Sequence, residues 1–301
     1  MITIANVRKK FGPVVALDDV TLTIGASERV AFVGTNGSGK TTLLRALLGL
    51  LRFDGKITIA GSDVAREPEL ALRAVAYIPQ IAPPIEAPVA EVVRAHAALR
   101  DRSPEATYER ARHLGLDVSA SKQKRFRDLS GGMKQKLLAA MALATEAPVL
   151  VCDEPTANLD HDARTAFFEE LAERPASSVV VLCSHRIEEV QKLVGRVVEL
   201  RDGHVLRDAP LGDVLRELKA FRVEVVLRDG ATKVEALLRA RGFSPCGKGR
   251  LGAEVAQHEK VELVTRLLAE HSDVLSDLSI VPIEDLHAAP RPHLSLVEKV
   301  S

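Results

Sequence analysis

Residues 34–41 carry the most informative chemistry of this chain. They read Gly-Thr-Asn-Gly-Ser-Gly-Lys-Thr and fit the phosphate-binding loop pattern GxxxxGK[ST]. Such a loop turns successive backbone N–H groups toward one point, where side chains would crowd a chain of phosphates. We expect Lys40 to reach the β- and γ-phosphates and the hydroxyl of Thr41 to ligate Mg²⁺. The pattern predicts that the chain binds a nucleoside triphosphate. The predicted binding residues are Gly34, Thr35, Asn36, Gly37, Ser38, Gly39, Lys40, Thr41 and Thr42.

The segments on either side of this loop are suited to position it. Residues 29–33 form a short apolar run that predicts a buried parallel strand, and residues 41–48 predict a helix. The positive end of the helix dipole would then face the phosphates. A glycine-rich turn that fits the pattern by chance is the alternative, and the strand and helix around the loop argue against it.

Composition narrows the class of protein. The chain has 301 residues, with 41 Lys or Arg and 41 Asp or Glu, so its formal charge is balanced. This balance does not suggest a basic nucleic-acid surface or a polybasic membrane footprint. The absence of a long apolar run and of a signal-peptide pattern predicts a soluble chain that stays in the cytoplasm. Cys152, Cys183 and Cys246 are widely spaced, which argues against a disulfide frame or a zinc site.

The order of the expected elements predicts an α/β fold. Residues 89–145 read mainly as helices, and residues 149–200 alternate between strand and helix, which implies a parallel sheet covered by helices. Residues 197–200 and 204–207 flank Asp202-Gly203, which is a strong hairpin signal. The strands expected in the first part are 2–7, 20–24, 29–33, 56–59 and 75–78.

A change of pattern after residue 218 predicts a second, smaller domain. We expect residues 1–218 to form the first domain, with a helical subdomain at about 85–145. Residues 221–287 predict a small α+β domain in the order β-α-β-α-β. Residues 288–301, with Pro290 and Pro292, are expected to be a flexible tail.

Further segments carry residues suited to phosphate chemistry. Leu129-Ser-Gly-Gly132 precedes a long expected helix, and the apolar run 149–152 ends in two carboxylates. In order and spacing the set resembles the nucleotide-binding subunit of an ATP-binding cassette (ABC) transporter, over residues 1 to about 218. The fold this implies is a P-loop NTPase of the ABC type with a small antiparallel β element and a helical subdomain. The motif residues are Gln80, Ser130, Gly131, Gly132, Asp153, Glu154, Asp160 and His185.

The resemblance gives each catalytic candidate a role. Asp153 would hold Mg²⁺ with Thr41, and Glu154 would be the base that polarises the attacking water. His185 resembles the switch histidine that holds Glu154 and water in line with the γ-phosphate. The alternatives are a solvated strand end for the two acids and a structural role for the histidine.

Two further residues take their roles from the family. Gln80 resembles the Q-loop glutamine, which senses Mg²⁺ and water and links the site to the membrane partner; a surface loop residue beside Pro79 is the alternative. Phe11, next to Gly12, resembles the aromatic residue that stacks on adenine, and a core phenylalanine is the alternative.

The signature Ser130-Gly131-Gly132 implies a second subunit. Its hydroxyl and backbone N–H groups at a helix start form a second γ-phosphate cradle, which would face the P-loop of another copy. Two ATP molecules would be sandwiched in a head-to-tail dimer, expected to be a homodimer, with Asp160 crossing the interface. Met133 stands where the family most often has Gln, and we expect little loss of activity from it.

The function implied by the resemblance is ATP hydrolysis that drives alternate access in a separate integral membrane permease. The chain would lie on the inner face of the cell membrane through this permease, and its short C-terminal domain resembles that of exporter ATPases. A soluble ABC ATPase that acts on the ribosome or on DNA is the main alternative, disfavoured by the single cassette and the balanced charge. A cytosolic scaffold with degraded catalysis conflicts with intact catalytic positions.

Overall fold

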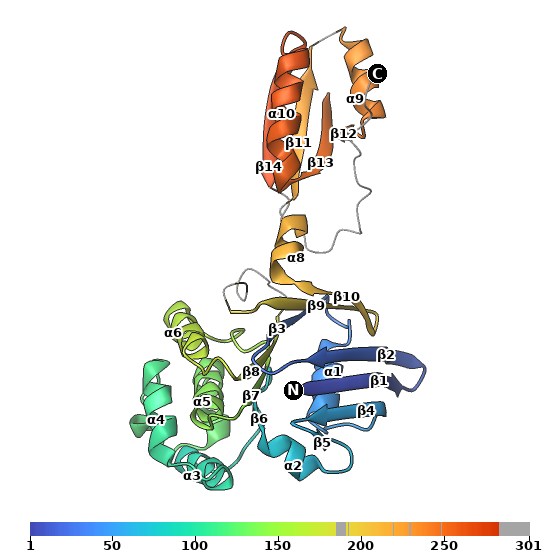
Figure 1. Ribbon diagram of the computed structural model, residues 1–301. Coiled ribbons are helices and arrows are strands. Elements are labelled where there is room, and N and C mark those ends of the chain that lie inside the picture. Colours follow the sequence, from blue (N-terminus) through green and yellow to red (C-terminus); the bar gives the residue numbers. More distant parts are fainter. Residues whose placement is uncertain (185–190, 192, 219, 229, 248, 283–301) are drawn as a thin grey trace. The chain divides into compact units, whose positions relative to one another are not determined.

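The structure, a computed structural model, describes residues 1–184, 191, 193–218, 220–228, 230–247 and 249–282. The chain divides into two compact units, Met1–Leu211 and Gly212–Ser301 (Figure 1). The division lies at the start of helix α8, Leu211–Leu218, which the sequence placed in the first domain. His185 and the predicted tail 288–301 lie outside the described residues.

A six-stranded sheet forms the centre of the first unit. Its strand order is β10-β9-β3-β8-β7-β6, and every neighbouring pair is parallel except β10 with β9. All five residues of β7 and of β8 are buried, as expected for central parallel strands covered on both faces. The strands are β3 Arg29–Val33, β6 Val75–Ile78, β7 Val149–Asp153, β8 Val179–Cys183, β9 Arg196–Arg201 and β10 His204–Pro210.

The hairpin between β9 and β10 confirms the Asp202-Gly203 prediction. His204 pairs with Arg201, so these two residues alone make the turn. Their φ angles are 50° and 81°, the positive values that a two-residue type I′ turn requires.

A four-stranded antiparallel sheet, in the order β2-β1-β4-β5, confirms the expected β element at the start. Strand β1 extends beyond the predicted residue 7 to Phe11, and β2 begins before residue 20, at Val14. The added part of β1 is mostly exposed and polar, and the added part of β2 begins with the exposed Val14 and Val15, so neither part has an apolar residue at every second position. The strands are β1 Ile2–Phe11, β2 Val14–Ile24, β4 Asp54–Ile59 and β5 Ser62–Asp63.

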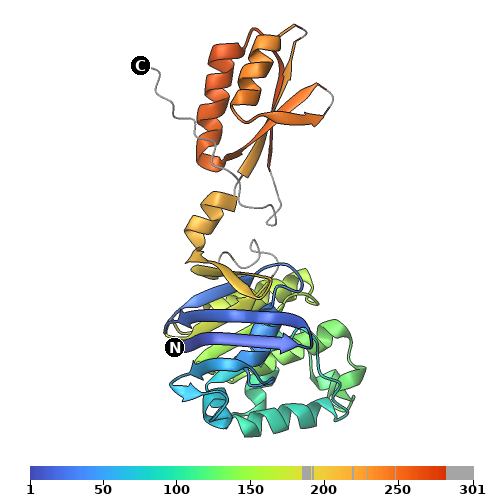
Figure 2. The same ribbon diagram turned by 90° about the vertical axis from the view of Figure 1, so that its right-hand side faces the viewer.

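Helices cover both faces of the central sheet (Figures 1 and 2). Helix α1 packs between the two sheets, and its leucines join the main hydrophobic core with residues of β1, β3 and β7. The helical segment 85–145 contains α3, α4 and α5 on the other side. The helices are α1 Lys40–Leu47, α2 Pro68–Arg73, α3 Val89–Leu99, α4 Pro104–His113, α5 Gly131–Ala144 and α6 His161–Ala172, with short 3-10 turns at Ser119–Ser121 and Phe126–Asp128.

The second unit has one strand more than the sequence predicted. Its order is β-α-β-β-α-β, a split βαβ arrangement with an antiparallel sheet β12-β13-β11-β14 and its own core. The prediction of β-α-β-α-β missed β12 because Ser244–Gly247 is exposed throughout and has no apolar alternation. The elements are β11 Ala220–Leu227, α9 Thr232–Ala240, β12 Ser244–Gly247, β13 Arg250–Ala256, α10 Gln257–His271 and β14 Leu275–Pro282.

Candidate phosphate-binding and catalytic site

The loop 34–41 connects the end of β3 to the start of α1, as the sequence predicted. Gly34 and Gly39 have φ angles of 147° and 106°, where side chains are disfavoured. A Cβ at Gly34 would lie 2.3 Å from the carbonyl oxygen of Leu200, and one at Gly39 would lie 2.7 Å from that of Ala16. Both positions therefore require glycine, because a side chain there would collide with the neighbouring backbone at Leu200 or Ala16.

The turn between β9 and β10 supports the loop, which the sequence did not indicate. The N–H of Gly203 donates to the carbonyl oxygen of Ser38 at 3.1 Å, and the N–H of Asp18 donates to that of Gly203 at 2.9 Å. A Cβ at Gly203 would lie 3.0 Å from the carbonyl oxygen of Ala16. Gly203 thus allows the tight hairpin turn and also holds the phosphate loop in place through its hydrogen bond to Ser38.

The start of α1 has the features of an anion site. Its N-cap is Gly39, which offers no side-chain hydrogen bond, and its first turn has no acidic residue. The N–H groups of this turn therefore suit a phosphate as their cap. The Nζ of Lys40 donates to the carbonyl oxygens of Gly34 at 2.7 Å and Thr35 at 2.9 Å. These partners are neutral, so the cation's charge is available to a phosphate group.

Thr41 and Asp153 meet where a divalent cation would bind. The hydroxyl of Thr41 donates to Oδ1 of Asp153 at 3.4 Å, although the residues belong to α1 and β7. Asp153 is 2% exposed, and this burial is the main cause of its raised pKa; the bond from Thr41 opposes it and the charge of Glu154 adds to it. A hydroxyl beside a buried carboxylate fits Mg²⁺, which prefers oxygen ligands and would favour the charged carboxylate.

Glu154 follows β7 in an unusual backbone conformation. Its φ is 47°, in the left-handed region that a non-glycine residue rarely adopts, and its N–H donates to the carbonyl oxygen of Cys183 at 3.1 Å. Such outliers gather at functional sites. The burial of Asp153 contradicts the alternative of a simple solvated strand end.

The signature residues lie at the N-terminus of α5. Ser130 is the N-cap, and its Oγ accepts a hydrogen bond from the N–H of Met133 at 3.2 Å. A Cβ at Gly132 would lie 3.1 Å from the carbonyl oxygen of Asn158, whereas one at Gly131 would meet nothing within 4 Å. Ser130 and Gly131 are exposed, so this helix start is open to a ligand from outside.

Asp160 is held within its own chain. Its Oδ1 caps α6 by accepting the N–H of Ala163 at 2.9 Å, and its Oδ2 pairs with Nζ of Lys136 at 2.8 Å. The hydrogen bond from Lys136 is the main cause of the lowered pKa of Asp160. The contact that Asp160 is predicted to make across a dimer interface stays a prediction.

Phe11 and Gln80 are both exposed. The ring of Phe11, at the end of β1, is 52% exposed, which contradicts the core alternative, and Nζ of Lys9 lies 5.0 Å from the ring centroid. Gln80 follows β6, the neighbour of β7, so the strand order brings it to the same edge of the sheet as Asp153. Adenine stacking on Phe11 and Mg²⁺ sensing by Gln80 stay predictions.

Gln135 is a site residue that the sequence reasoning missed. It is 1% exposed, and its Nε2 donates to the carbonyl oxygens of Pro155 at 3.1 Å and Pro79 at 3.4 Å. One side chain of α5 thus joins the segment after Glu154 to the segment before Gln80. The available signal was an amide among the buried apolar residues of α5.

The parallel sheet, the phosphate loop and the carboxylates at the end of β7 define a P-loop nucleoside triphosphatase. Residues 17–157 match the ABC transporter family. The chain is 30% identical to a daunorubicin resistance ATP-binding protein of Streptomyces coeruleorubidus, over 76% of this chain and 74% of that protein. It is 31% identical to the Nod factor export ATP-binding protein I of Burkholderia lata, over 75% and 77%.

Solved structures agree with these relatives. The ATP-binding subunit of an ABC transporter aligns with a TM-score of 0.65 at 28% identity, over 72% of this chain and 92% of that chain. A dimeric bacterial ABC transporter cassette aligns with a TM-score of 0.61 at 27% identity, over 70% and 99%. The chain belongs to the ATP-binding subunits of ABC transporters and is similar to those of exporters.

The family fixes the coarse function. The protein binds ATP and hydrolyses it to power a membrane transporter, and the alternative of a soluble ATPase on the ribosome or DNA is not favoured by these relatives. Within the described residues, no helix is long and apolar enough to cross a membrane.

Proposed function

We propose that the chain forms a head-to-tail homodimer that binds two ATP molecules between its subunits and drives an integral membrane permease in an export transporter. The relatives named for export and resistance, and the dimeric cassette among the similar structures, support this proposal. The protein would lie at the inner face of the membrane through its permease. ATP binding would close the dimer, hydrolysis and product release would reopen it, and these movements would drive the permease.

The contact between Thr41 and Asp153, with Glu154 next in the chain, is the observation that supports the catalytic assignment most strongly. Thr41 and Asp153 would hold Mg²⁺, which neutralises charge on the β- and γ-phosphates. Glu154 would orient the attacking water and accept its proton, and Lys40 would contact the β- and γ-phosphates. Gln80 would contact Mg²⁺ and water, and His185 would align the water with Glu154.

Ser130, Gly131 and Gly132 would cradle the γ-phosphate of the ATP held by the partner's P-loop. The start of α5 is exposed, so its hydroxyl and N–H groups are accessible to a phosphate brought by another subunit, which supports this assignment. Asp160 would stand beside this cradle through its bond to Lys136 of α5. Phe11 would stack on the adenine of its own subunit's ATP.

A mixing experiment tests the composite site. Lys40→Ala removes the P-loop cation and Ser130→Phe blocks the signature, so each variant alone should lack ATPase activity. In a mixed dimer one of the two sites would be intact, and activity of about a quarter of the unmodified protein should return. No recovery on mixing, although both variants fold, would show that the site is completed within one chain.

We also propose that residues 221–287 form a domain that helps the subunits associate or regulates their coupling to the permease. This unit has its own core around Val223, Val225 and Leu238. Its edge strand β14 spans Leu275–Pro282 and leaves Ile280 and Val281 exposed. A long edge strand is a template for pairing with another chain, which supports a role in association.

A further inference from the structure

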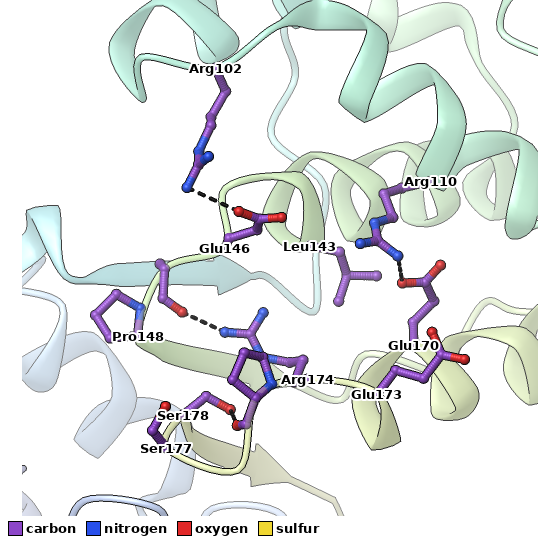
Figure 3. Close-up of a pocket in the computed structure, with 12 residues that line it drawn as sticks. Arg102, Arg110, Leu143, Glu146, Pro148, Glu170, Glu173, Arg174, Ser177 and Ser178 are labelled. Carbon is purple, nitrogen blue, oxygen red and sulfur yellow. Dashed lines mark hydrogen bonds and ion pairs between the residues drawn. The ribbon is translucent and has the colours of Figure 1, made fainter.

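A cavity lies away from the phosphate-binding site (Figure 3). Its volume is about 500 Å³, and it is lined by residues that immediately precede β7 and β8, such as Pro148 and Ser178. Asp153 stands at the opposite end of β7. Five residues of strand separate the two places, or about 15 Å. The cavity is therefore distinct from the nucleotide site.

Most cations that line the cavity are neutralised by carboxylates. Nη2 of Arg102 pairs with Glu146 at 3.2 Å. Arg110 of α4 pairs closely with Glu170 of α6, which is 5% exposed and also contacts Nδ1 of His113 at 2.9 Å. The Arg110–Glu170 pair joins α4 to α6, and the two ion pairs leave little free charge on either arginine.

Arg174 is different. Its half-buried guanidinium points into the cavity (Figure 3). Nη2 donates to the carbonyl oxygen of Ala147, and Nε is buried with no hydrogen-bond partner. Within the described part of the chain, Arg174 has no carboxylate within ion-pair distance. Burial is the main cause of its lowered pKa, and the charge of Glu146, which is itself paired with Arg102, opposes this shift only in part.

We propose that this cavity binds a small molecule through one oxyanion, a carboxylate or a phosphoryl group, held by the free side of the Arg174 guanidinium. A guanidinium carries five N–H donors in a planar fork that fits either oxyanion. The buried side chain of Leu143 adds an apolar wall for the body of the ligand.

The position of the site suggests what the ligand would affect. Arg110 and the helix α4 lie on one side of the cavity, and the segment from α6 to β8 that carries Arg174 lies on the other. A ligand that binds Arg174 and packs against Leu143 of α5 would add a contact between the helical segment and the part that carries Arg174, which already meet through the Arg110–Glu170 pair. It would therefore stabilise the packing of the helical segment against the central sheet.

Calorimetric titration of the full chain with inorganic phosphate and, separately, with benzoate tests the proposal at constant ionic strength. Lys40→Ala is present throughout, because the P-loop also attracts phosphate. Saturable binding of either probe is expected, and the probe that binds identifies the oxyanion. Arg174→Gln should weaken this binding at least tenfold, whereas Arg94→Gln, which removes an exposed arginine of α3, should leave it unchanged.

Arg174→Lys is the second variant, since it keeps the charge and the stem of the side chain but loses the fork; it should bind several-fold more weakly than the parent. It also replaces Arg174→Gln if that protein does not fold by circular dichroism. Equal affinity in the parent and both Arg174 variants would overturn the proposal. If neither probe binds the Lys40→Ala protein saturably, the proposal is also overturned, and the assignment of the nucleotide site is unaffected.

Discussion

Gln135→Leu should damage turnover more than ATP affinity. The side chains are similar in volume, so the change removes the amide without opening a cavity. The carbonyl oxygen of Pro155 then loses a buried bond of 3.1 Å, while the 3.4 Å bond to Pro79 is long and contributes less. Leaving one buried carbonyl unpaired costs about 1–3 kcal/mol in the free energy of unfolding. For a unit of this size, each kcal/mol lowers Tm by about 2–4 °C.

The effect on catalysis follows from what the amide holds. Gln80 and Glu154 lie one residue from Pro79 and Pro155, so their backbone loses a common anchor, whereas the contacts of the P-loop are unaffected. Misplaced catalytic groups lower the rate of the chemical step, and a displacement of about 1 Å can cost 10²-fold. We expect kcat to fall at least tenfold with the Kd for ATP changed less than threefold.

Steady-state ATPase assays measure kcat, binding of labelled ATP measures Kd, and thermal melts measure Tm, all on the same protein preparations. Gln123→Leu is the matched control, because it makes the same chemical change at an exposed position and should shift stability by no more than about 0.5 kcal/mol. A normal kcat in folded Gln135→Leu, or a loss of kcat equal to the unfolded fraction, would refute the positioning role.

Four other changes give distinct readouts. Glu154→Gln should keep ATP binding, lower hydrolysis by about 10² or more and trap an ATP-bound dimer on size-exclusion chromatography; near-normal turnover would remove it from the catalytic role. Lys40→Ala should weaken binding of labelled ATP, and unchanged affinity would contradict the P-loop assignment. Because burial raises the pKa of Asp153, its ionised form costs stability above that pKa. Asp153→Asn should therefore raise the Tm of nucleotide-free protein at neutral pH, by an amount that shrinks as the pH falls, while Mg²⁺-dependent hydrolysis is lost; a lower Tm at neutral pH would refute this. Truncation after Leu218 should leave ATP binding intact but change dimer stability or transport, and a folded, truncated protein that binds no ATP would place residues beyond 218 in the site.

The sequence predicted the features that depend on local pattern. The phosphate loop needs glycines at fixed spacing, and the β9–β10 turn needs Asp-Gly, so both appear in short stretches of sequence. The fully buried strands β7 and β8 appear as continuous apolar runs. Strand β12 has no such run, because it pairs at an edge of its sheet with all of its residues exposed.

The features that were missed depend on backbone atoms distant in the chain. Gln135 bonds to carbonyl oxygens 20 and 56 residues away, and no residue type marks a carbonyl acceptor. The support that Gly203 gives to Ser38 has the same origin. Asp160 was predicted from its family role alone, and its bond to Lys136 required the packing of α6 beside α5.

The same helix, α5, carries the signature and the anchor of the catalytic segments. Its first residues, Gly131 and Gly132, would contact the partner's ATP in the proposed dimer, and its Gln135 lies about one turn further along. Backbone hydrogen bonds link each turn of the helix to the next, so a displacement of the first turn would also move the turn that carries Gln135. Movement of the signature as the partner binds ATP would therefore displace Gln135 and, through its hydrogen bonds, the backbone at Pro79 and Pro155 of the same chain. In the proposed dimer, the contacts of Gln135 with Pro79 and Pro155 would therefore couple the two nucleotide sites.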